Sequence, residues 1–126
     1  MNTFEKLATP VGRVLLASVF LMSGISKIGA FAATQGYMES VGLPGILLAP
    51  TIAFEIAAAL AIMVGIYARI AALLLAGFSL MTAFVFHFDF ADQIQTIMFL
   101  KNLSIAGGLL ILASTGPGPL SINAKR

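Results

Sequence analysis

The chain has 126 residues, of which 60% are hydrophobic and 10% are charged, and its formal net charge is +2. A soluble domain carries about 25% charged residues, so this composition favours lipid as the surrounding medium. The seven basic residues form no stripe, which argues against nucleic-acid binding, and the absence of cysteine excludes disulfides and cysteine-ligated metals. With one histidine as well, no metal site is expected, and residues 1–126 are expected to form one domain.

Four apolar stretches are long enough to cross the roughly 30 Å hydrocarbon layer, which takes about 20 helical residues. Transmembrane helices are expected at about residues 11–30, 46–66, 70–88 and 96–114. Between the first two, Thr34 is expected to cap a short interfacial helix, with Tyr37 at the headgroup level. The short connection after the second helix forces a hairpin, so the sequence predicts an all-α, integral membrane, four-helix antiparallel transmembrane bundle.

The first apolar stretch also has features of a secretory signal. It follows Lys6 and Arg13, and the small-residue sequence Ala-Phe-Ala at positions 30–32 resembles a cleavage site. Polar residues such as Ser23 and Lys27 interrupt the segment before that site. They favour an uncleaved first helix.

The distribution of basic residues predicts the orientation. Basic residues concentrate on the cytoplasmic side of membrane proteins. Arg13 and Arg69 are interpreted as reaching toward the headgroups there. Both termini are therefore expected to be cytoplasmic, because five of the seven basic residues lie on their side of the membrane: Lys6, Arg13, Arg69, Lys125 and Arg126.

Five polar residues lie within or at the ends of the predicted spans: Lys27, Glu55, His87, Lys101 and Asn102. An ionised side chain at a helix centre costs about 2.5–3.5 kcal/mol on insertion scales, so each one requires a partner. With both termini inside, the topology places all five in the outer half of the membrane. This convergence predicts a polar pocket there.

Two interpretations of this cluster follow from the residues. In the first, Glu55 is the deepest ionisable group, lysines supply counter-charges, and His87 exchanges a hydrogen bond with a bound carbonyl or hydroxyl. Such a set suits a quinone head group or a proton relay, with Glu55 and His87 as candidate catalytic groups. In the second, a bridge from Glu55 to a lysine only satisfies buried charge, and His87 lies in the headgroup zone.

The sequence resembles the DoxX family over nearly its whole length. No single motif is decisive, but the order and spacing of the similar segments are specific. These segments are residues 13–16, 23–28, 37–44, 55–69, 72–77, 86–87, 101–108 and 116–118.

The resemblance implies a multi-pass protein of the bacterial inner (plasma) membrane. Relatives include the small membrane subunit of thiosulfate:quinone oxidoreductase and proteins linked to quinone or catechol stress and oxidant defence. The five polar residues fall on recurring positions of the family, which favours the ligand or proton role. The lack of cysteine argues against an autonomous thiosulfate oxidase.

The leading functional hypothesis is a membrane component of a redox or quinone-linked system that is not catalytic alone. No intrinsic cofactor is expected, a quinone-like molecule is the candidate ligand, and electrons would come from a redox partner protein or from the substrate itself. The alternative is a non-enzymatic membrane scaffold, or partner subunit, that recruits a redox enzyme. A weaker third hypothesis is a small transporter, for which a homo-oligomer would supply the internal symmetry that such proteins need.

Overall fold

The computed structural model describes residues 2–122, and all of its regular elements are helical. Four helices are long and apolar enough to cross a membrane, which confirms the predicted all-α membrane bundle. The orientation of the termini relative to the cytoplasm stays a prediction. The elements are α1 (Thr3–Gly29), α2 (Phe31–Ser40), a 3-10 turn η1 (Gly45–Leu47), α3 (Leu48–Val64), α4 (Ala68–Phe86) and α5 (Gln93–Thr115).

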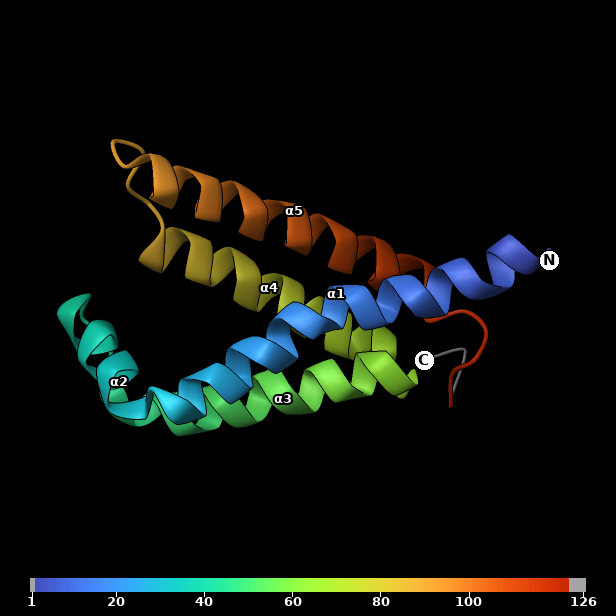
Figure 1. The fold of residues 1–126 in the computed structure, drawn as a ribbon, viewed down its shortest axis with the longest axis horizontal. Coiled ribbons are helices and arrows are strands. Elements are labelled where there is room, and N and C mark those ends of the chain that lie inside the picture. Colours follow the sequence, from blue (N-terminus) through green and yellow to red (C-terminus); the bar gives the residue numbers. More distant parts are fainter. Residues whose placement is uncertain (1, 123–126) are drawn as a thin grey trace.

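The long helices form two pairs. Helix α1 packs along α3, α4 packs along α5, and a short turn joins α3 to α4. Figure 1 shows the pairs close together near the N-terminus and moving apart toward the end that carries α2. Small residues fill the centre of the bundle and let the helices approach closely. They include Ala17, Ala59, Ala72, Ala76 and Ala106, each no more than 2% exposed.

Helix α1 begins earlier than its hydropathy predicts, at Thr3 instead of residue 11. The side chain of Asn2 accepts a hydrogen bond from the Glu5 amide at 2.8 Å and so caps the first turn. Pro10 lies inside the helix and removes one backbone donor, yet the helix continues through it. The helix therefore begins before the apolar stretch that predicted it, because the Asn2 cap extends it toward the N-terminus.

The expected short helix after the first span is present as α2, but Thr34 does not cap it. Helix α2 begins at Phe31, and the Thr34 hydroxyl donates back to the Ala30 carbonyl at 2.8 Å. The ring of Tyr37 stacks on Phe86 of α4, with centroids 5.3 Å apart. Helix α2 thus reaches across from the end of α1 to α4.

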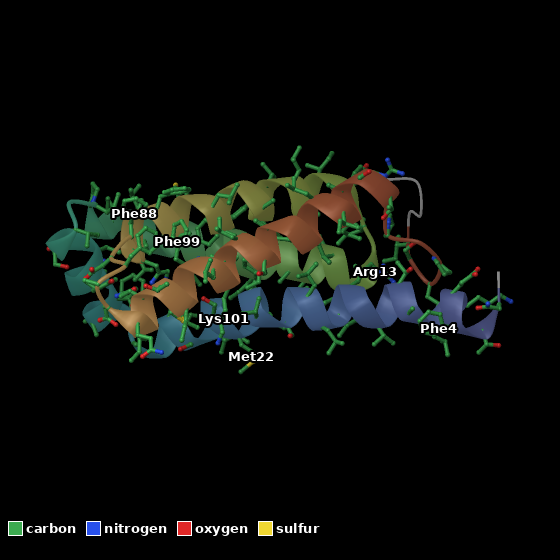
Figure 2. All side chains as sticks on the ribbon, turned by 90° about the horizontal axis from the view of Figure 1, so that it is seen from above. Phe4, Arg13, Met22, Phe88, Phe99 and Lys101 are labelled. Atoms are coloured by element: carbon green, nitrogen blue, oxygen red, sulfur yellow. The ribbon has the colours of Figure 1, made fainter. Side chains whose placement is uncertain are left out.

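Aromatic rings at the end of α4 and in the loop that follows it pack against α5. Phe84, Phe88 and Phe90 each contact Phe99 of α5, with centroid distances of 5.0 to 5.9 Å. Figure 2 places Phe88 and Phe99 at the opposite end of the molecule from Arg13. This cluster holds the end of α4 and the loop against α5.

At the other end, the segment after α5 folds back against the bundle. Arg13 is only 2% exposed, and its Nη2 donates to the Leu120 carbonyl at 2.7 Å. The Ile122 amide donates to the Val64 carbonyl at 3.1 Å. The expectation that Arg13 reaches toward headgroups is wrong, because its guanidinium binds backbone carbonyls of the chain itself.

Candidate functional site

A cavity of about 320 Å³ lies between the two helix pairs, and its lining includes Tyr37 of α2. All five helices contribute residues to its lining, and so does His87, which directly follows α4. Aromatic and aliphatic side chains such as Phe20, Phe78 and Phe86 form much of the wall. The polar lining residues are Ser23, Lys27, Tyr37, Glu55, Ser79, Thr82, His87 and Asn102.

One wall carries an ion pair between α1 and α3. The ammonium of Lys27 lies 2.9 Å from Oε2 and 3.0 Å from Oε1 of Glu55, so it donates to both carboxylate oxygens. The Ser23 hydroxyl donates to Oε1 at 3.3 Å. Glu55 is 2% exposed and Lys27 is 27% exposed, so the carboxylate is the buried member of the pair.

Local packing explains why α1 and α3 approach closely enough for this contact. Gly24 lies one turn before Lys27, and a Cβ added there would meet Cγ1 of Ile56 at 2.7 Å. The absence of a side chain at Gly24 therefore lets α3 lie directly against α1. The Lys27 ammonium also lies 5.8 Å from the ring centroid of Phe78, within the range of a cation–π interaction.

The other pair of helices is joined by an amide. Nδ2 of Asn102 on α5 donates to the Thr82 hydroxyl at 3.0 Å and to the Ser79 carbonyl at 3.3 Å, both on α4. Thr82 in turn donates to the same carbonyl at 3.1 Å. Asn102 thus holds α4 against α5 and also presents a polar surface to the cavity.

His87 stands at the end of α4 and bonds to the start of α5. Its Nδ1 lies 2.6 Å from Oε1 of Gln95. The carboxylate of Asp92 accepts from the Gln95 amide at 3.3 Å and caps α5. Gln95 lies just before the expected span of residues 96–114, and the capping Asp92 three residues earlier is the sequence signal that places it in the first helical turn.

Four of the five polar residues expected to converge do line one cavity: Lys27, Glu55, His87 and Asn102. Lys101 does not line it, and its side chain is exposed on α5 (Figure 2). Successive residues on a helix point about 100° apart, so Lys101 and Asn102 face different directions. Thr82 and Tyr37 also line the cavity, although no feature of the sequence pointed to either contact.

This arrangement combines groups of complementary hydrogen-bonding character around one space. Lys27 offers N–H donors and Glu55 offers acceptors. The Thr82 oxygen can accept, because its hydrogen is donated to the Ser79 carbonyl. His87 offers a donor or an acceptor, depending on its tautomer. A ring-shaped ligand with oxygen atoms on opposite sides could bond to both walls while its faces contact the aromatic lining. Proton transfer is also within the chemistry of the carboxylate and imidazole.

Comparison with known proteins gives the family. The DoxX family model matches residues 8–88. The chain is 46% identical to the inner membrane protein YqjF of Escherichia coli (strain K12), over 98% of this chain and 95% of that protein. It is 36% identical to the inner membrane protein YphA of the same organism, over 91% of this chain and 87% of that protein. No solved structure matches the chain. The chain is thus a multi-pass inner-membrane protein and belongs to the DoxX family.

Proposed function

We propose that this protein is the membrane component of a redox system and that its cavity holds the head group of a quinone or quinone-like aromatic molecule. The observation that carries the proposal is the cavity between the helix pairs, with Lys27 and Glu55 on one wall and His87 and Asn102 on the other. Its volume of about 320 Å³ is at the lower end of the roughly 300–1,000 Å³ typical of ligand pockets, so it suits a head group alone.

The polar residues would act on the oxygen atoms of the ring. Lys27 would donate to one oxygen while remaining close to Glu55, and His87 would face the oxygen at the other end. Phe78 and Phe86 would contact the faces of the ring. An apolar tail would lie along the lipid-facing surface of the bundle.

The protein side chains can bind the ring and exchange protons with it, but none of them supplies electrons. Conversion of a quinone to a quinol takes two electrons and two protons. We therefore assign the electrons to a redox partner protein, and to this chain the binding of the ring and the handling of protons by Glu55 and His87.

A second candidate function is supported by the ion pair itself. Both Glu55 oxygens already accept from Lys27, so the buried charge is satisfied without any ligand. This favours a non-enzymatic scaffold in which the pair joins α1 to α3 and the protein recruits a redox enzyme.

Binding of ubiquinone or menaquinone to the purified protein in detergent tests the proposal. The wild type should bind one of them saturably, and Lys27→Met should weaken binding at least about fivefold, as expected for the loss of the hydrogen bond that Lys27 donates to a ring oxygen. Lys6→Gln, an exposed lysine on the same helix as Lys27, is the control and should bind as the wild type. If the folded, helical wild type binds neither quinone, the scaffold function gains support, and partner capture becomes the next experiment.

A further inference from the structure

The hydrogen bond between His87 and Gln95 lies at the edge of the proposed site and joins two well-placed residues. His87 ends α4, where its amide donates to the Ala83 carbonyl at 3.1 Å. Gln95 lies in the first turn of α5, which Asp92 caps through two backbone amides. The contact between the two side chains, at 2.6 Å, is therefore held by ordered backbone on both sides.

The chemistry of this contact determines where the imidazole carries its proton. Oε1 of Gln95 is a carbonyl oxygen and can only accept a hydrogen bond. An unprotonated Nδ1 is also an acceptor, and two acceptors at 2.6 Å would repel each other. With Oε1 of Gln95 turned toward the ring, the hydrogen is assigned to Nδ1. In the neutral ring, Nε2 is then the acceptor.

The two side chains differ in their access to the cavity. His87 lines it, whereas Gln95 does not. The Nδ1 edge of the ring is taken up by Gln95, which leaves Nε2 as the nitrogen available to a ligand. Across the cavity, the Lys27 ammonium can only donate.

We propose that Gln95 is a positioning residue that holds His87 in the Nδ1–H tautomer, so that the cavity favours the reduced, quinol form of its ligand. The preference for a quinol rests on the proposed function. A quinol hydroxyl donates to Nε2 of His87, and the hydroxyl at the other end of the ring accepts from Lys27. A quinone has carbonyl oxygens only, so it bonds to Lys27 but gains nothing at His87.

The tautomer can be observed directly because the chain contains one histidine. In the ¹⁵N-histidine-labelled protein, two-bond couplings to the ring protons assign each nitrogen as N–H or bare. The wild type and Gln95→Glu, whose carboxylate also accepts from Nδ1–H, should show hydrogen on Nδ1. Gln95→Leu should show a mixture of tautomers. Hydrogen on Nε2 in the neutral wild-type ring would overturn the inference, whatever the protein binds.

The ligand preference is tested with decylubiquinol and decylubiquinone. The wild type should bind the quinol about fivefold more tightly than the quinone, as expected for one additional hydrogen bond. Gln95→Leu should bring the ratio of quinol affinity to quinone affinity close to one, with quinone affinity within about twofold of the wild type. Gln95→Glu should restore the wild-type ratio. Gln93→Leu, an exposed glutamine in the same helical turn, is the matched control and should behave as the wild type.

The outcomes separate the two proposals. The same quinol-to-quinone affinity ratio in the wild type and Gln95→Leu would overturn the role of Gln95 in ligand preference while leaving quinone binding intact. A ratio close to one in the wild type would overturn the quinol preference itself. Binding of neither molecule by the folded wild type would overturn both the quinol preference and the proposed function. In that case the nitrogen couplings would still decide whether Gln95 fixes the tautomer.

Discussion

The ion pair between Lys27 and Glu55 predicts unequal effects when either member is replaced. The carboxylate is 2% exposed, whereas the lysine is 27% exposed and has some freedom to turn outward. Lys27→Met leaves a buried negative charge without a counter-charge. Glu55→Gln leaves a positive charge whose ammonium can reach more polar surroundings. We therefore expect Lys27→Met to be the more destabilising change.

The sizes of these effects follow from the geometry. Removal of one partner of a buried ion pair costs about 3–5 kcal/mol, and partial exposure of Lys27 places the cost of Lys27→Met at about 3 kcal/mol. Glu55→Gln keeps a similar shape and some hydrogen bonding, so a loss of about 1–2 kcal/mol is expected. The double variant contains no unpaired charge. It should lose about 2 kcal/mol, well below the sum of the two single changes.

A double-mutant cycle measures this coupling. The free energy of unfolding is obtained from reversible SDS titration in mixed micelles, followed by helical circular dichroism. Lys6→Met combined with Glu55→Gln is the control cycle and should be additive, because Lys6 is exposed near the far end of α1. A cost below about 1 kcal/mol for Lys27→Met, or additivity in the Lys27 cycle, would refute the reasoning.

Two further predictions concern packing and the C-terminal segment. Gly24→Ala places a Cβ 2.7 Å from Cγ1 of Ile56 and should lower the free energy of unfolding by about 1–3 kcal/mol. Gly77→Ala, which meets nothing within 4 Å, is the control and should be neutral or stabilising by up to about 1 kcal/mol in the same titration. Arg13→Met should speed hydrogen exchange of the Ile122 amide about tenfold, because a charge-assisted hydrogen bond worth about 1.5 kcal/mol is lost. Unchanged exchange would mean that Arg13 does not hold the segment.

Hydropathy alone was sufficient for the number and approximate extent of the spans, because lipid imposes a length and a composition on each of them. It was not sufficient for the start of α1. That boundary depends on the hydrogen bond from Glu5 to the side chain of Asn2, outside the apolar stretch. The conformation of Arg13 could not be predicted from hydropathy either, because the carbonyl that it binds belongs to Leu120, 107 residues away in sequence.

The sequence predicts how deep each residue of the candidate site lies along its helix. It does not predict which way the helix is rotated, and so which side chains face the cavity. The depth of a residue in the membrane depends only on its position along the span, so the sequence could place four residues at a similar level. These are the four that line the cavity: Lys27, Glu55, His87 and Asn102. Helical periodicity indicates that Lys101 and Asn102 cannot both face one cavity, but it does not say which of them does. That choice depends on how α5 packs against α4.

The contact between Arg13 and the segment after α5 has a consequence for synthesis of the protein. The helix that carries this guanidinium is the first to be made, whereas its carbonyl partner at Leu120 emerges only after all four long helices. Until then, the arginine must be held by water, lipid phosphate or the insertion machinery. The last step of assembly at this end therefore exchanges a temporary partner for a permanent one.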